Sequence, residues 1–175
     1  MRDGFSMLVR DRTEADIDAC VALTRLVHLS DGYPTFLPDD LPGFIKAPEA
    51  LRAWVADEDG EVAGHVVLNP KSSAPVMELA SKTLGLPASR LCVVARLLVS
   101  PGHRRRGLGR CLLETASREA HERGLWPILD AVTTHEAAIA LYDSCGWVRA
   151  GIVAVRWGDH PEVEELVYLG PGPGR

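Results

Sequence analysis

The fold of this chain is decided by the stretch Val99-Ser100-Pro101-Gly102-His103-Arg104-Arg105-Arg106-Gly107-Leu108-Gly109-Arg110-Cys111-Leu112-Leu113. An apolar run leads into a turn with three consecutive arginines and two glycines one residue apart, and an amphipathic helix follows. Glycine lets the backbone adopt unusual dihedral angles and approach a ligand closely. The first amides of a helix have no partner within the helix, and the helix dipole adds positive potential there. The stretch therefore predicts an anion site, most naturally for a phosphate.

The composition is that of an ordinary globular protein. With 175 residues, 46% hydrophobic and 25% charged, the chain is expected to form one domain with a substantial core. Its net charge of -5 argues against a general nucleic-acid binder, because such proteins neutralise phosphates. No apolar run approaches the roughly 20 residues of a membrane span, and residues 1–4 contain no apolar signal region. We therefore expect a cytoplasmic protein that binds neither membranes nor nucleic acid.

The four cysteines are far apart and form no CxxC pair, so we expect reduced, mostly buried thiols and no metal site; they are Cys20, Cys92, Cys111 and Cys145.

Before the glycine loop, the pattern predicts a strand over 7–10 and then a helix opened by a capping box at 13–16. A proline-rich loop follows over 33–48, where Pro38, Pro42 and Pro48 are expected to prevent any regular element. A hairpin over 51–68 turns at 57–60, where Asp-Gly separates two apolar runs. A helix over 75–86 and a buried strand over Leu91–Val99 complete this part.

After the loop, an apolar stripe at helical spacing predicts a helix that ends near Gly124; the stripe is Leu108, Leu112, Leu113, Ala116 and Ala120. A strand over 127–132 leads to a second predicted capping box, at Thr133 and Glu136, and to a helix that stops at Gly146. Two strands over 147–157 and 163–169 follow, and residues 170–175 are expected to be a frayed tail.

This element order and two motifs resemble the GCN5-related N-acetyltransferase (GNAT) family. Arg104, Gly107 and Gly109 match its motif of Arg or Gln, two residues, Gly, one residue, then Gly or Ala. Residues 138–147 match its Ala-x-x-Leu-Tyr, followed by Gly and an aromatic residue. The resemblance implies an α/β (α+β) fold: a mixed, mostly antiparallel sheet with helices on both faces and a splayed parallel strand pair. Residues 1–175 would then form a single N-acetyltransferase domain.

The resemblance also implies acetyl-CoA as co-substrate. Its pyrophosphate would lie on the residues of the glycine loop: Arg104, Arg105, Arg106, Gly107, Leu108 and Gly109. Its pantetheine arm would pair like an added strand with the backbone of Leu97, Leu98 and Val99. Tyr142 would contact the cofactor and act as general acid on the leaving thiolate, since a phenol has an ordinary pKa near 10 and is protonated at neutral pH.

Two positions depart from the family pattern. His135 stands where many relatives have an Asn that contacts CoA, so it either supplies a hydrogen bond or is a solvated residue at the helix start. Arg96 stands where many relatives have a carboxylate base, and arginine stays protonated. Arg96 either pairs with an internal carboxylate such as Glu78 or Asp130, which we favour slightly, or holds a negatively charged acceptor. Candidates for the base are then Glu78, Asp130, His65 and His28.

The predicted function is direct transfer of acetyl from acetyl-CoA to a primary amine on a small molecule or peptide, in a chain that could form a homodimer. The alternative is a non-catalytic acyl-CoA-binding sensor or partner protein of the same fold. Arg96 in place of a carboxylate favours the alternative, and Tyr142 favours the enzyme.

Overall fold

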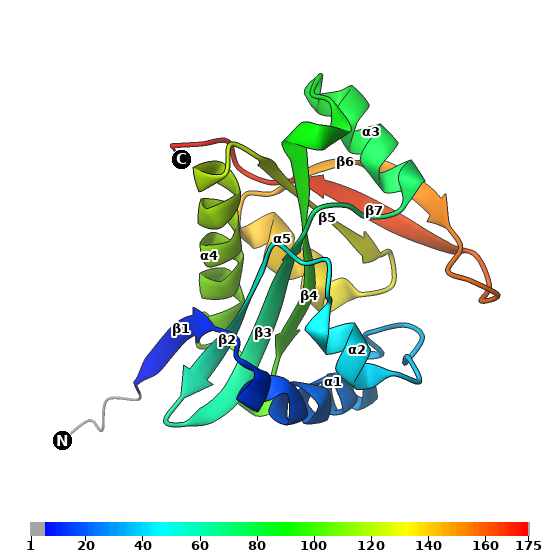
Figure 1. The fold of residues 1–175 in the computed structure, drawn as a ribbon. Helices are drawn as coiled ribbons and strands as arrows, with labels where there is room; N and C mark the ends of the chain where they lie inside the picture. Colours follow the sequence, from blue (N-terminus) through cyan, green and yellow to red (C-terminus); the bar gives the residue numbers. More distant parts are fainter. Residues whose placement is uncertain (1–5, 175) are drawn as a thin grey trace. The chain divides into compact units, whose positions relative to one another are not determined.

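The computed structural model describes residues 6–174, and their seven strands form one sheet in the order β1-β2-β3-β4-β5-β7-β6 (Figure 1). The strands are β1 (Met7–Asp11), β2 (Arg52–Glu58), β3 (Glu61–Asn69), β4 (Leu91–Val99), β5 (Trp126–Val132), β6 (Val148–Val155) and β7 (Val163–Leu169). The helices are α1 (Ile17–Asp31), α2 (Leu41–Lys46), α3 (Ala74–Leu84), α4 (Leu108–Glu122) and α5 (Glu136–Ser144). Short 3-10 helices are η1 (Glu14–Asp16), η2 (Ala88–Arg90) and η3 (Pro101–His103).

Strand β4 pairs with β5 in parallel, whereas the pairs β1–β2, β5–β7 and β6–β7 are antiparallel. The predicted mixed, mostly antiparallel sheet with one parallel pair is therefore confirmed. Contacts between residues divide the chain into two compact units, residues 1–67 with 96–115 and residues 68–95 with 116–175. Strand β4 and helix α4 each contribute residues to both units.

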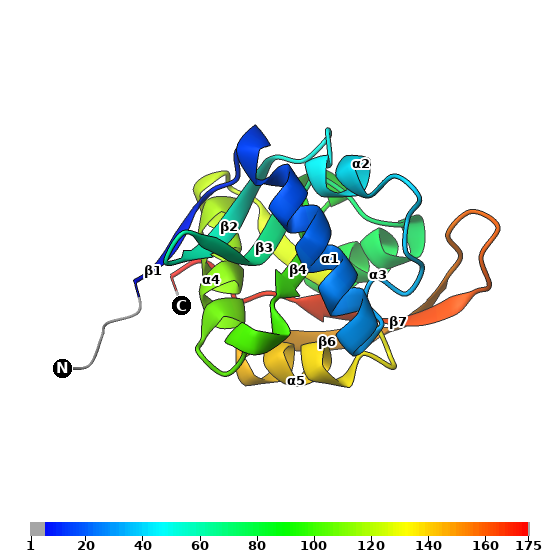
Figure 2. The ribbon, with the colours of Figure 1, turned by 90° about the horizontal axis from the view of Figure 1, so that it is seen from below.

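In the first unit, strands β2 and β3 lie between two helices. Helix α1 buries one face against Val55 of β2 and Leu98 of β4, and Figure 2 shows α1 running over these strands. Neighbouring residues of a strand point to opposite faces, so Ala56 faces away from α1. Gly64 of β3 lies on that other side, where a Cβ would stand 2.9 Å from Leu112 of α4. Glycine is thus required at 64 for α4 to pack closely on the strand.

The predicted loop over 33–48 contains the short helix α2, so the expectation that its prolines prevent regular structure is wrong. Pro42 stands in the first turn, where the missing N–H of proline breaks no helical hydrogen bond. Asp40 caps this turn by accepting a hydrogen bond from the Gly43 amide at 2.9 Å. The helix matters for the site because it carries Phe44 and Ile45.

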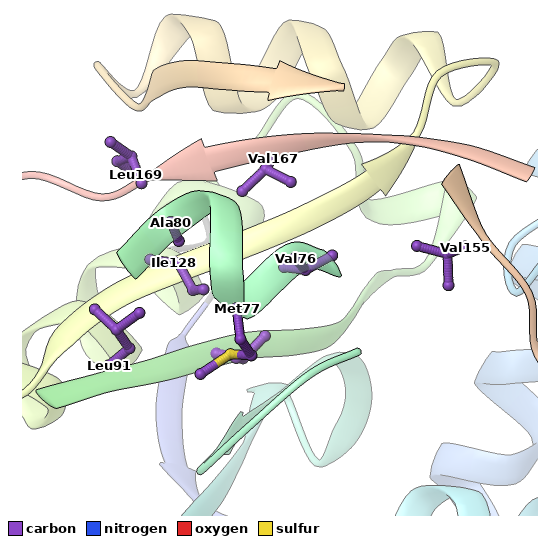
Figure 3. Packing of buried hydrophobic residues seen from close by; sticks show 9 residues of the cluster. Val76, Met77, Ala80, Leu91, Ile128, Val155, Val167 and Leu169 are labelled. Atoms are coloured by element: carbon purple, nitrogen blue, oxygen red, sulfur yellow. The ribbon is translucent and has the colours of Figure 1, made fainter. Parts of the chain in front are cut away.

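In the second unit, α3 covers β4, β5 and β7. Its Val76, Met77 and Ala80 are buried against apolar side chains of the strands, including Leu91 and Ile128, as Figure 3 shows. Ile128 of β5 and Leu169 of β7 stand opposite each other in the antiparallel pair, and both belong to this cluster. This is expected, because residues that stand opposite each other in an antiparallel pair share a face of the sheet. The face of β5 that carries Ile128 also carries Asp130, two residues further along.

Two predictions for the second unit are wrong. The N-cap of α5 is His135 and Glu136 is its first residue, so Thr133 and Glu136 do not form the predicted capping box. Gly170, assigned to a frayed tail, is ordered: its amide donates to the Pro127 carbonyl at 2.8 Å and its carbonyl accepts from Trp126. A Cβ at 170 would lie 2.7 Å from the Pro127 carbonyl oxygen, so this position requires glycine.

The four cysteines are free thiols, two of them buried (Cys20 and Cys92) and two partly exposed. None of the helices within 6–174 combines the length and the apolar character needed to cross a membrane.

Candidate functional site

The glycine loop turns the chain sharply just before α4 begins. Arg105 and Gly107 have positive φ angles of 62° and 81°, which turn the chain sharply between η3 and α4. The Cys111 amide makes the first helical hydrogen bond of α4, to the Gly107 carbonyl at 3.0 Å. The amides of Leu108 and Gly109 precede that bond and have no carbonyl within the helix to reach. A Cβ on Gly107 would meet nothing within 4 Å, so the backbone is open to a ligand.

Two of the three loop arginines are held by carboxylates of the same unit. Arg104 makes a two-bond pair with Asp31 at the end of α1, with 2.9 Å between Nη1 and Oδ1. Arg106 donates to Oε1 of Glu58 at 2.8 Å, and Glu58 is 6% exposed. The exposed Arg105 pairs with no carboxylate among the residues described. These pairs tie the loop to α1 and β2.

Strand β4 extends beyond its pairing with β5. The parallel register ends at Val93↔Ile128, and β4 continues to Val99. In this last part Leu98 is buried against α1, while Leu97 and Val99 are partly exposed. The residues predicted to pair with pantetheine thus follow the point where the parallel ladder stops, in the same unit as the glycine loop.

Tyr142 lies in the second unit, on α5, and is 8% exposed. Its ring meets the edge of Tyr168 at 5.4 Å between centroids and an angle of 65°. The Tyr168 hydroxyl donates to Asp143 at 2.9 Å, and Asp143 also accepts from Arg149. Burial and the Asp143 carboxylate raise the pKa of Tyr168 to about 12. Tyr168 is therefore a neutral, fixed neighbour that holds the ring of Tyr142 in place.

His65 was one of four candidates for the general base, and the structure excludes it from that role. It is fully buried, its Nδ1 lies 2.9 Å from the Arg96 carbonyl, and its Nε2 lies 3.1 Å from Nη1 of Arg12. A guanidinium only donates, so Nε2 accepts and the proton stands on Nδ1. Burial lowers the pKa of His65 to about 4, and the nearby Arg12 adds to the effect. The imidazole is neutral and both ring nitrogens are engaged.

Arg96 does not have the internal carboxylate partner that the sequence favoured. Its guanidinium stacks on Phe44 at 4.5 Å from the ring centroid. Its Nη1 is buried without a hydrogen-bond partner among residues 6–174. Neither proposed partner pairs with it: Glu78 is exposed on α3, and Asp130 bonds with Ser72 and Glu165. The expectation failed because Phe44 of α2, and not a carboxylate, lies against the guanidinium.

Glu165 of β7 is buried, and the partly buried Asp130 of β5 lies beside it. They are diagonal neighbours on one face, since Asp130 is paired with Val167 and Glu165 with Val132. Their mutual hydrogen bond requires a proton, and burial raises the pKa of both carboxyls. Ser72 donates to Asp130 at 3.1 Å. Of the remaining base candidates, His28 has its Nδ1 2.8 Å from the Pro34 carbonyl.

Sequence reasoning missed Arg12, Glu58 and Glu165 as site residues. Glu58 was assigned to the turn of the hairpin, yet it is the buried last residue of β2. Glu165 follows another glutamate, Glu164, near the start of β7, where two adjacent charged residues look like an exposed strand end. No local signal distinguishes these residues, because their burial depends on which helix covers the strand.

The strand order, the single parallel ladder and the glycine-loop helix that follows β4 define the N-acetyltransferase class of folds. The chain belongs to the acetyltransferase (GNAT) family, whose model matches residues 21–147. The predicted family is thus confirmed.

Relatives and solved structures agree with this assignment. A mycothiol acetyltransferase of Saccharomonospora viridis is 31% identical over 157 residues, which is 88% of this chain and 45% of that protein. The chain thus spans less than half the length of this relative. NAA60 of Arabidopsis thaliana, crystallised with acetyl-CoA, has a TM-score of 0.70 at 16% identity, over 94% of this chain and 97% of that one. A ribosomal-protein-alanine N-acetyltransferase of Brucella melitensis has a TM-score of 0.69 at 24% identity, over 93% and 98%.

Proposed function

We propose that this chain transfers the acetyl group of acetyl-CoA directly to a primary amine, and that residues 1–175 act as one N-acetyltransferase domain. The observation that carries the proposal is the glycine loop: amides at the start of α4 that precede its first helical hydrogen bond, in the segment that follows the strand whose ladder with β5 has stopped. Membership of the GNAT family supports the chemistry, and the relative from Saccharomonospora viridis is itself named an acetyltransferase.

The residues present fit acetyl-CoA. The backbone of Arg104–Gly109 would receive the pyrophosphate, because the α4 dipole and the open amides favour an anion there. Arg105 would add a charge, since its two neighbours are already paired with carboxylates. The backbone of Leu97, Leu98 and Val99 would pair with the pantetheine arm as an added strand.

Bound acetyl-CoA supplies an activated thioester. The amine nitrogen forms the new bond to the acetyl carbon, the carbon–sulfur bond breaks, and the electron pair leaves on sulfur. Backbone N–H groups of β4 would polarise the carbonyl, which contributes electrostatic stabilisation of the developing oxyanion. Tyr142 would donate its proton to the sulfur, and the contacts with Tyr168 hold its ring for that task. For the amine proton, Asp130, Glu78 and His28 stay candidates.

The test is an assay of CoA release with a panel of primary amines, combined with calorimetry of CoA binding. We expect CoA to bind and at least one amine to be acetylated, with acetylation verified by mass spectrometry. Binding without acetylation of any amine would favour the sensor protein instead. A homodimer and a cytoplasmic location stay predictions, which light scattering and fractionation of cells would test.

A further inference from the structure

The backbone of Arg96 is unusual in two respects. Arg96 is an arginine with a left-handed φ of 53° in the interior of strand β4, a conformation that strains a residue with a side chain. The carbonyl of the same residue is held by Nδ1 of the fully buried His65 at 2.9 Å. A buried neutral imidazole thus fixes the bend in the strand, and the bend sets where the Arg96 side chain leaves it.

The guanidinium of Arg96 is left with unsatisfied donors. Phe44 occupies one face of the planar group, and the residue as a whole is partly exposed, so a partner would have to meet the N–H groups along its edge. Its Nη1 is buried and bonds with no acceptor among the residues described. Burying a cation costs free energy unless a counter-ion compensates it, and none of the carboxylates in residues 6–174 does so.

The surroundings add positive charge rather than cancel it. Arg12 lies close enough to act on Arg96 electrostatically, and its own guanidinium donates to neutral acceptors: the carbonyls of Ile45 and Lys46, and Nε2 of His65. The other group that acts on Arg96 is the phenol of Tyr33. The carboxylates of Glu14 and Asp16 act on Arg12, but no described carboxylate acts on Arg96. The Arg96 guanidinium, stacked on an aromatic ring beside a second guanidinium, is therefore the group suited to a planar anion.

We propose that the Arg96 guanidinium binds a carboxylate of the acceptor, so that the substrates of this enzyme are primary amines that also carry a carboxylate. This inference rests on the proposed acetyl transfer and specifies its substrate class. A carboxylate matches the free edge of a guanidinium with two parallel hydrogen bonds, whereas an amide or ester cannot supply the charge. Arg96 is a specificity residue in this proposal, and His65 is a positioning residue that acts through it.

The test uses matched amines that differ only in the carboxylate: glycine and glycinamide, L-alanine and L-alaninamide, L-phenylalanine and L-phenylalaninamide, and glycylglycine and its amide. We compare the wild type with Arg96→Gln and with Arg118→Gln, a control at an exposed arginine of α4. For the wild type and the control, we expect kcat/KM to favour acids over amides by about tenfold to a hundredfold, as for a hydrogen bond to a charged group. Arg96→Gln should remove this preference by raising the KM for the acids, whereas Arg118→Gln should keep it.

Thermal stability provides a readout that does not require transfer. The acids at millimolar concentration should raise the melting temperature of the wild type and of Arg118→Gln, and not that of Arg96→Gln. If no amine is acetylated but this stabilisation occurs, the proposed transfer fails and the carboxylate site stands. Equal use of acids and amides by the wild type, or an equal loss for both in Arg96→Gln, would overturn the carboxylate site while transfer stands. A large loss of CoA affinity in Arg96→Gln would assign the guanidinium to a phosphate of CoA instead, which also overturns it.

Discussion

The burial of His65 as a neutral imidazole predicts a specific dependence of stability on pH. In the unfolded chain this side chain takes up a proton below its ordinary pKa of about 6.5. In the folded protein it does so only near pH 4, because burial and the Arg12 charge disfavour the imidazolium. Between these values the unfolded state binds more protons, so the contribution of His65 to stability is complete above pH 6.5 and is lost as the pH falls to 4.

The size of the effect follows from the difference between the two pKa values. About 2.5 pH units at 1.36 kcal/mol per unit correspond to roughly 3 kcal/mol. That is a large fraction of the 5–15 kcal/mol by which a typical domain is stable. The carboxyl pair of Asp130 and Glu165 acts in the opposite direction over part of this range, so the total slope of the wild type does not isolate the histidine.

The assay is therefore a difference measurement. Urea unfolding between pH 7.5 and 4.5 is compared for the wild type, for His65→Asn and for His160→Asn, a control at an exposed histidine. His65→Asn removes the titrating group and retains a donor for the Arg96 carbonyl. We expect it to be less stable than the wild type at pH 7.5 and to lose less stability on acidification, whereas His160→Asn follows the wild type. Parallel curves for the wild type and His65→Asn, or an NMR titration of His65 near pH 6.5, would refute the reasoning.

The other predictions concern the loop, the general acid and the carboxyl pair. Gly107→Ala places a side chain at a φ of 81° and should weaken CoA binding about tenfold or more. The control Gly102→Ala, at a position with open space and no positive φ, should leave CoA binding unchanged. Equal CoA affinities of the two variants by calorimetry would contradict the role of the loop backbone. Tyr142→Phe should lower kcat by ~10²-fold or more with CoA affinity unchanged, and full activity in a folded variant would exclude Tyr142 as the acid. Because its pKa is raised in the folded protein, the Glu165 carboxyl contributes stability that is present below its ordinary pKa of about 4.5 and lost as the pH rises through the raised value. Glu165→Gln should therefore remove the decline in stability that this carboxyl contributes between about pH 4.5 and 8, and an unchanged urea midpoint profile would count against a shared proton.

The elements with strong local signals were predicted closely. Strands β4 and β7 have the predicted bounds, and all five apolar residues of the α4 stripe are buried. Helix α2 was missed because the presence of proline was weighed more heavily than its position in the first turn. The N-cap of α5 was placed two residues too early, because a capping-box pattern in the sequence does not show how many residues separate the helix from the preceding strand.

In the candidate site, too, the residues with a local sequence signal were predicted and their distant partners were not. Arg104–Gly109 and Tyr142 stand in contiguous motifs, so their residue types and spacing are visible without a structure. The partners of Arg104 and Arg106 are 73 and 48 residues away along the chain, and no pattern links them. The carboxylate expected beside Arg96 is replaced by Phe44 of α2, a helix that the sequence did not predict.

The sequence by itself determined the family, the element order and the glycine loop, because these depend on local dihedral preferences and on apolar periodicity over a few turns or strands. Only the tertiary structure decided which charges are buried and with which partners: the neutral His65, the proton shared by Asp130 and Glu165, and the uncompensated Arg96. Burial of a charge is a property of everything packed around it, and its free energy depends on distances between residues far apart in the chain. The acceptor selectivity proposed for Arg96 therefore depends on packing, whereas the proposed acetyl-CoA site lies in one short segment, residues 104–109.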